Sequence, residues 1–162
     1  MLTGSDGINS GVGAQLSKGK LKVYDTGARI INGQAPVSAF DGLGEGVWMF
    51  ADTSVPNGKV TLITNVQLEA GNDPNATFGW TMVAQPGAIK IPNDDVTILG
   101  SEAADMAKSL AANWHARTKP WLVTIVESEA AFWKITFSTS SGVPQWQSEP
   151  RVTVVGDAVR PK

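Results

Sequence analysis

The chain has 162 residues, which fits one domain with its own hydrophobic core, and its formal net charge is −2. Charged residues make up only 17% of the sequence and no dense run of Lys or Arg occurs, so nucleic-acid binding is disfavoured. The chain has no cysteine, which excludes disulfides and zinc–thiolate sites. It also has no apolar stretch as long as a signal peptide or a membrane span needs.

Low charge together with 17 glycines and 9 prolines is typical of a loop-rich β protein. Such a surface fits two situations equally: a subunit that hides much of its surface in an assembly, and a self-contained fold with many neutral loops. Residues 1–20 are rich in Gly, Ser and Asn and cannot bury enough apolar surface to order themselves. We therefore expect an extended N-terminal arm, ordered by a neighbouring subunit, followed by a single β-rich domain over residues 21–162.

Short strands separated by turns are predicted for most of the rest of the chain. Asp25-Thr26-Gly27 and Asn32-Gly33 have the composition of turns. The clearest single strand is Lys59–Glu69, in which apolar and polar residues alternate with period two. The remaining predicted strands cover residues 21–24, 28–31, 47–51, 77–83, 88–91, 96–99 and 151–155.

One helix is predicted, over about residues 101–116, with Ser101 as a candidate N-cap and Pro120 preventing its continuation. Its apolar residues recur at helical spacing, at Ala103, Met106, Ala107, Leu110 and Trp114. Trp121–Phe137 then alternates on both sides of Glu127-Ser128-Glu129, which predicts a β-hairpin. Together these elements predict a mainly β fold: an antiparallel β-sandwich or a jelly-roll-like barrel, with one α-helix and an extended arm.

Asp25-Thr26-Gly27-Ala28 resembles the active-site loop of retropepsin-like aspartic proteases. The resemblance implies two carboxylates that share one proton, with the second aspartate supplied by a homodimer partner. The sequence departs from that family, because a Gly- and Ser-rich segment stands where a folded hairpin is expected and the chain continues far beyond the helix. A plain turn is therefore the favoured interpretation of this motif.

No other motif predicts bond-breaking chemistry. His115 is the single histidine and the aspartates lack the spacing of a calcium loop, so we predict no catalytic, cofactor-binding or metal-binding residue and no cofactor. Trp146 lies in a predicted loop, where anchoring in a partner and packing within its own chain are equally favoured, with stacking on a sugar third. With apolar residues of the arm, the candidate partner-binding residues are Trp146, Gln145, Gln147, Leu2, Ile8, Val12 and Leu16.

Thr64–Gly71 is similar to a strand ending in jelly-roll modules of bacteriophage fibre and tail proteins. The resemblance, the arm and the low charge imply a non-enzymatic structural subunit of a virion, either a capsid decoration protein or a tail protein. It would assemble with itself and with other virion subunits, bind neither nucleic acid nor membrane, and be found in the virion or, before assembly, in the cytoplasm. The alternatives are a carbohydrate-binding module and, third, the aspartic protease that uses Asp25.

Overall fold

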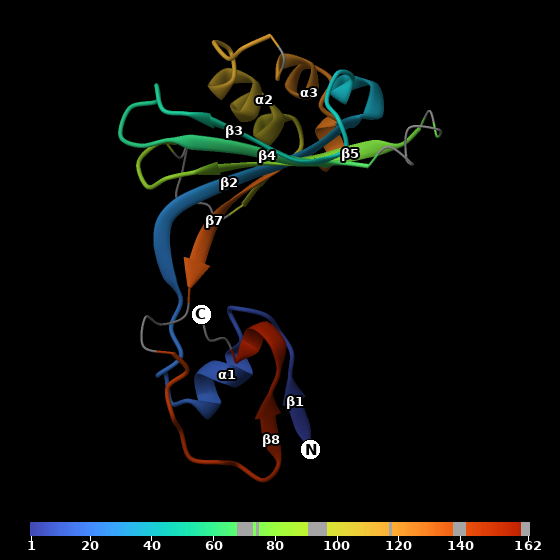
Figure 1. Ribbon diagram of the computed structural model, residues 1–162. Helices are drawn as coiled ribbons and strands as arrows, with labels where there is room; N and C mark the ends of the chain where they lie inside the picture. Colours follow the sequence, from blue (N-terminus) through green and yellow to red (C-terminus); the bar gives the residue numbers. More distant parts are fainter. Residues whose placement is uncertain (68–72, 74, 91–96, 117, 138–141, 160–162) are drawn as a thin grey trace. The chain divides into compact units, whose positions relative to one another are not determined.

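A computed structural model describes residues 1–67, 73, 75–90, 97–116, 118–137 and 142–159. It divides into two compact units (Figure 1). Unit 1 combines Met1–Thr26 with Ile135–Lys162, and unit 2 is Gly27–Lys134. The chain therefore leaves unit 1, forms unit 2 and returns to unit 1, whereas the sequence predicts one domain after residue 20. Among the residues described, no helix has the length and apolarity to cross a membrane.

Unit 2 is built on a six-stranded sheet with the order β3-β4-β5-β2-β7-β6. The pairs β3–β4, β4–β5, β2–β5 and β6–β7 are all antiparallel. The strands are β2 (Tyr24–Pro36), β3 (Gly46–Asp52), β4 (Val60–Val66), β5 (Thr77–Ala84), β6 (Thr97–Leu99) and β7 (Ala131–Phe137). A mainly β fold is thereby confirmed, but the sheet stays open and forms no barrel, and neither a sandwich nor a jelly roll is supported.

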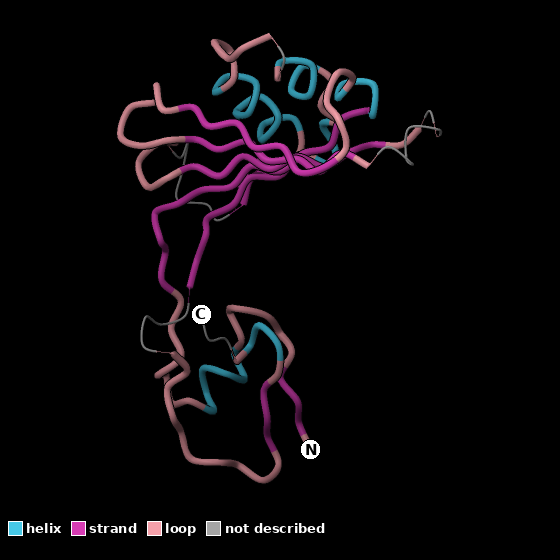
Figure 2. The backbone as a smooth tube through the Cα atoms, viewed as in Figure 1, coloured by secondary structure: helices cyan, strands magenta, loops and turns pink. Residues whose placement is uncertain are grey.

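Helices of unit 2 cover one face of this sheet, and no described helix of unit 2 covers the other, open face (Figures 1 and 2). They are α2 (Ser101–Leu110) and α3 (Lys119–Val123), with 3-10 turns at Val37–Phe40 and Glu127–Glu129. The covered face is apolar because alternate residues point to it. In β5 these are Phe78, Trp80, Met82 and Ala84, all buried. Layers of this kind leave no room for a second sheet over the same face.

The β-hairpin predicted over Trp121–Phe137 is confirmed in its second strand and wrong in its first. Its second strand exists as β7, but its first half, from Trp121 onward, is mainly the helix α3. Pro120 occupies the first turn of this helix, where its missing N–H costs nothing. Trp121, Leu122 and Ile125 are buried while Val123 is 72% exposed, which is helical and not strand spacing.

The predicted end of the helix and two predicted turns also differ from the structure. The helix expected to reach residue 116 ends at Leu110, and Trp114 lies beyond it, where its indole N–H donates to Asp52 Oδ2 at 2.6 Å. The turns expected at Asp25 and Asn32 do not form, because both residues lie inside the 13-residue strand β2. Asp25 is thus on a strand and not in a protease-like active-site loop. Of the segment Thr64–Gly71, residues 64–66 belong to β4 and residues 68–71 lie outside the described part of the chain.

Unit 1 holds two parallel strands and a short helix. β1 (Leu2–Gly4) pairs with β8 (Val152–Val154), in the register Leu2↔Val152 and Gly4↔Val154. The helix α1 covers Gly11–Leu16, and a 3-10 turn follows β8 at Gly156–Ala158. Residues 1–20, expected as an extended arm, therefore contain a strand and a helix that pack within the chain itself.

Candidate functional site

The candidate site lies where β1 and β8 end. Because the two strands are parallel and in register, their carboxyl ends meet at the same edge of the sheet. β1 leads into Ser5-Asp6-Gly7 and β8 into Val155-Gly156-Asp157, two loops that each carry a glycine and an aspartate. The backbone N–H of Val155 donates to the carbonyl of Gly4 at 2.9 Å and joins them. In open sheets of parallel strands, ligands bind outside the carboxyl ends.

Hydrogen bonds hold the first loop against the start of α1. The Asp6 carboxylate accepts from Ser10 Oγ and, at 3.0 Å, from the backbone N–H of Gly11. Ser10 is the N-cap of α1, and its Oγ accepts from the N–H of Gly13 at 2.8 Å. The hydrogen bond from Ser10 is the main reason that the pKa of the Asp6 carboxyl is lowered, so this group is a stable acceptor at neutral pH.

Two glycines allow α1 to lie directly on the paired strands. A Cβ added to Gly13 would come within 2.8 Å of the carbonyl oxygen of Ala158, and one added to Gly4 within 2.8 Å of Val12 Cβ. Gly4 and Gly13 are both buried. The helix, β1 and the turn after β8 therefore form one closely packed body around the two aspartate loops.

A hollow of about 170 Å³ opens beside this body, entirely within unit 1. Polar groups of the segment between the first loop and α1, of the second loop and of the segment before β2 line it, together with aliphatic side chains. Its polar lining residues are Asn9, Ser10, Lys22 and Asp157, and its apolar ones include Ile8, Leu21 and Val159. The hollow thus offers hydroxyl, amide, carboxylate and ammonium groups at the point where parallel strands favour ligand binding.

The partner-binding residues predicted from sequence lie in this same unit. Trp146 is half-buried and, with Leu16, lines a hollow of about 240 Å³. Leu16 also lines a second hollow, of about 400 Å³, with Leu2, Val12 and Gln147. The structure therefore gathers these residues around α1 and β8, while their binding to a partner stays a prediction.

The other two residues predicted to bind a partner, Ile8 and Gln145, also belong to unit 1. Ile8 lines the 170 Å³ hollow beside Asp157. The backbone carbonyl of Gln145 accepts from Lys20 Nζ at 2.9 Å, so the Trp146 loop is tied to the segment after α1. Asp6, Ser10 and Asp157 were not predicted from the sequence. A signal was available, since a glycine followed closely by an aspartate occurs near each end of the chain, as Gly4-Ser5-Asp6 and as Gly156-Asp157.

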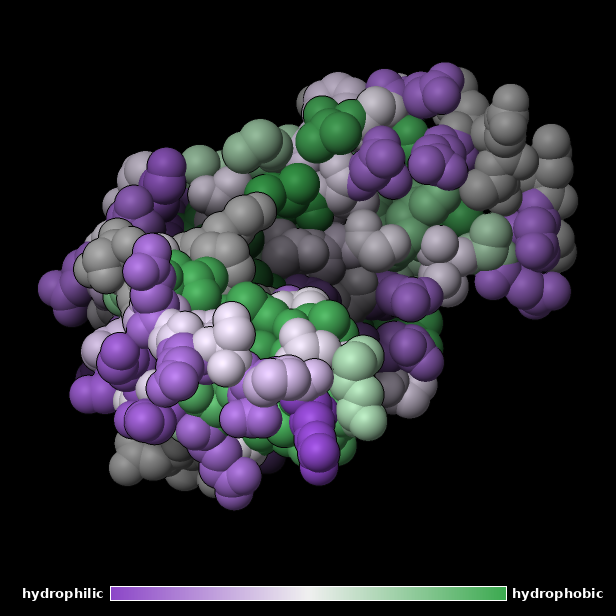
Figure 3. Space-filling view, turned by 90° about the horizontal axis from the view of Figure 1, so that it is seen from below, coloured by the Kyte–Doolittle hydropathy of each residue, from purple (hydrophilic) through white to green (hydrophobic). Residues whose placement is uncertain are grey.

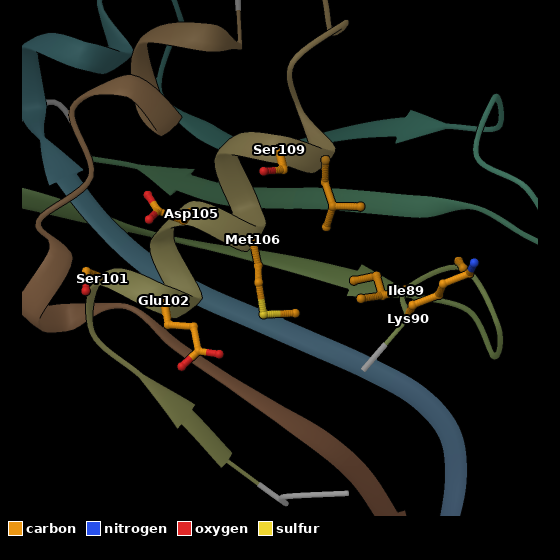
Figure 4. Close-up of a pocket in the computed structure, with 9 residues that line it drawn as sticks. Ile89, Lys90, Ser101, Glu102, Asp105, Met106 and Ser109 are labelled. Atoms are coloured by element: carbon orange, nitrogen blue, oxygen red, sulfur yellow. The ribbon is translucent and has the colours of Figure 1, made fainter. Parts of the chain in front are cut away.

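Unit 2 carries a larger hollow, of about 630 Å³, on the outer side of α2 (Figure 4). Met106 extends from α2 into it, with Ile89 and Lys90 on its far side. Glu102 and Asp105 stand at its rim, and Asp105 is paired with Lys108 at 3.5 Å. Within the described ranges, no three acidic or histidine side chains come together as a metal site requires. We therefore assign no metal site to this hollow.

The fold is similar to that of portions of solved structures that contain FAD. A protein of Photorhabdus luminescens subsp. laumondii TTO1, named as an FAD-containing monooxygenase, matches 98% of this chain with a TM-score of 0.69 and 19% identity. CtdE in complex with FAD matches with a TM-score of 0.67 and 16% identity, and a Klebsiella pneumoniae HpxO variant complexed with FAD with 0.68 and 13%. No protein-family model matches the chain, and no curated protein matches its sequence significantly.

The chain spans only 43%, 38% and 36% of the lengths of these three structures. At such low identity the likeness concerns the fold. It nevertheless overturns the predicted virion subunit, its placement in a virion, and the expectation that the chain is not an enzyme, because the similar structures named here contain FAD and none of them is a phage structural protein. The low charge and glycine-rich loops that suggested a virion protein are equally compatible with a segment that packs against further protein.

Proposed function

We propose that this chain is the portion of an FAD-dependent monooxygenase that supplies one wall of the flavin site and a sheet for the substrate. The observation that carries the proposal is the pair of aspartate loops at the carboxyl ends of the parallel strands β1 and β8, in a chain that matches FAD-containing proteins over 98% of its length. Parallel strands ending in glycine-containing loops are a common setting for dinucleotides.

The residues of the 170 Å³ hollow fit FAD chemically. The Asp157 carboxylate can accept hydrogen bonds from sugar hydroxyls, and the Lys22 ammonium can neutralise a diphosphate. The hollow takes only part of a dinucleotide, which agrees with a chain that spans about two-fifths of the FAD-containing structures. When bound, the flavin would supply the oxidation chemistry, while these residues hold and orient it.

Titration of FAD into the purified chain tests this proposal through the fluorescence of the flavin. We expect saturable binding that Asp157→Ala weakens at least about tenfold, the usual cost of one charge-assisted hydrogen bond. Asp41→Ala, an exposed aspartate of unit 2, is the matched control and should bind as the unchanged chain does. Absence of saturable binding, or equal binding by both variants, would count against a flavin site here.

The open face of the unit 2 sheet is the proposed substrate side. Side chains that alternate with the buried ones point to it, and the register places Ile30 opposite Val83 and Asn32 opposite Thr81. On the described strands of unit 2 from Ala28 onward, this face carries no charged side chain. Figure 3 views the protein from below the orientation of Figure 1 and shows hydrophobic residues interspersed with hydrophilic ones on the surface.

This neutral face also carries uncharged polar side chains, including Asn32, Thr61 and Thr81, and one polar atom near its centre is unmatched. Asn32 Oδ1 is buried and lacks a hydrogen-bond partner. Leaving such an acceptor unmatched costs about 1–3 kcal/mol, which a ligand donor would recover. A neutral, mainly apolar substrate with one hydrogen-bond donor fits this face, whereas an anion would meet no cation on it.

Binding of a neutral phenol and of the matching benzoate, followed by tryptophan fluorescence, separates these cases. Trp133 belongs to the same face and serves as the reporter. We expect the phenol to bind at least about tenfold more tightly than the benzoate, and Asn32→Leu to reduce that preference. Equal affinity for both compounds, or an unchanged preference in the variant, would contradict a neutral substrate face. Trp133→Phe should remove the signal, which controls for binding elsewhere.

A further inference from the structure

β3 is an edge strand with one unused side. It stands first in the sheet order, and β4 pairs with it over all seven residues, from Gly46↔Val66 to Asp52↔Val60. In the part of the chain that the structure describes, no strand pairs with its other side. A row of backbone N–H and C=O groups along that side is therefore available to a further strand.

The usual protections of an edge strand are missing from β3. It contains no proline, no Lys or Arg and no bulge in its register with β4. Its last residue, Asp52, is the only charged one, and its carboxylate accepts from Ser54 Oγ at 2.6 Å and from the indole of Trp114 at 2.6 Å. Asp52 is thus turned back toward its own chain. By contrast, the opposite edge strand, β6, has only three residues.

The exposed side chains of β3 are apolar, and the space beside it is open. Val47 is 68% exposed and Met49 65%, although both belong to a strand of a folded sheet. A hollow of about 490 Å³, lined by Met49–Asp52 and by Trp114 and Thr118, lies against the strand. This hollow therefore leaves room at the edge of the sheet.

We propose that β3 pairs antiparallel with β3 of a second copy of the chain, about a two-fold axis at Met49. In this register Met49 faces Met49, Val47 faces Ala51, and Asp52 faces Gly46, so no like charges are directly opposed. Each apolar side chain then gains an apolar neighbour on the same face, the pairing that stabilises antiparallel sheets. A two-fold contact uses the same patch on both copies, which this self-complementary strand satisfies. The two sheets become continuous.

Sedimentation velocity of the full chain tests this pairing over about a hundredfold range of concentration around the micromolar level, where a small interface is expected to dissociate. We expect a monomer–dimer equilibrium. Met49→Lys and Met49→Glu should each weaken the dimer at least about tenfold, because they oppose like charges across the axis. Leu99→Lys is the matched control, because Leu99 lies on the other edge strand, β6, and its side chain is about as exposed as that of Met49. This variant should dimerise as the unchanged chain does.

Mixing the two charged variants gives the decisive measurement. Because Met49 faces its own copy, the Lys and Glu variants should form a mixed dimer that neither forms alone. A chain that stays monomeric over the whole range, a Met49→Lys variant that dimerises unchanged, or a mixture that stays monomeric would each overturn the proposal. Circular dichroism of both variants should match the unchanged chain, since Met49 is exposed and its replacement leaves the core intact. None of these outcomes depends on flavin binding.

Discussion

Replacing Gly33 by alanine is expected to destabilise unit 2 by about 3 kcal/mol, a large share of the 5–15 kcal/mol that typically holds a domain together. Gly33 lies in the middle of β2 and faces the core. A Cβ added there would come within 2.3 Å of Trp80 Cζ2, a ring atom of a side chain that is only 2% exposed. The indole cannot move aside, because close-packed neighbours surround it.

Urea unfolding followed by tryptophan fluorescence measures this effect as a lower midpoint with an unchanged slope. Gly79→Ala is the matched control, since Gly79 lies on β5 opposite Gln34, is exposed, and has nothing within 4 Å of an added Cβ. Adding Trp80→Phe to Gly33→Ala should recover part of the loss, because the smaller ring relieves the clash. Equal midpoints for the two glycine variants would show that the indole does not lie against β2.

Replacing Trp121 by alanine is expected to cost about 3–5 kcal/mol of unfolding free energy, the usual range for removing a large buried aromatic side chain. Trp121 is fully buried, stacks on Phe40 with a centroid distance of 4.9 Å and meets Phe50 edge-on at 5.3 Å. It thus fixes α3 to both a 3-10 turn and the edge strand β3.

Val123→Ala is the control for this variant and also tests the local structure. In a strand, Trp121 and Val123 would share one face and both would be buried. In α3 they point to different sides, and Val123 is exposed, so its replacement should change the unfolding free energy by less than about 0.5 kcal/mol. Chemical denaturation of both variants gives the comparison. Two large and similar losses would favour the hairpin over the helix.

Elements whose own periodicity decides their structure could be predicted from the sequence. Val60–Val66 and Thr77–Ala84 alternate with period two and are β4 and β5, and the helix that follows Gly100 begins where its charge pattern and apolar stripe predict. The segment after Pro120 could not be assigned in this way. Its apolar residues are dense enough to fit either period, and burial against Phe40 and Phe50 selects the helix.

The sequence could predict local features of each of the two loops that form the candidate site, but not that the loops lie together. Ser10 as a cap for the turn after Asp6 is a local pattern, since Ser favours the start of a helix. Asp157, however, lies 151 positions after Asp6, and only the parallel pairing of β1 with β8 brings their loops together. Residues 1–20 show the same effect, because β8 supplies the partner that an isolated glycine-rich segment lacks.

The sequence by itself determined a mainly β protein with a helix after Gly100, low charge and apolar alternation in the central strands. The tertiary structure decided the division into two units, the helical state of α3, the meeting of the two aspartate loops and the exposure of β3. The reason is physical: alternation and capping act between near neighbours, whereas strand pairing and burial depend on which distant segment is present to receive them.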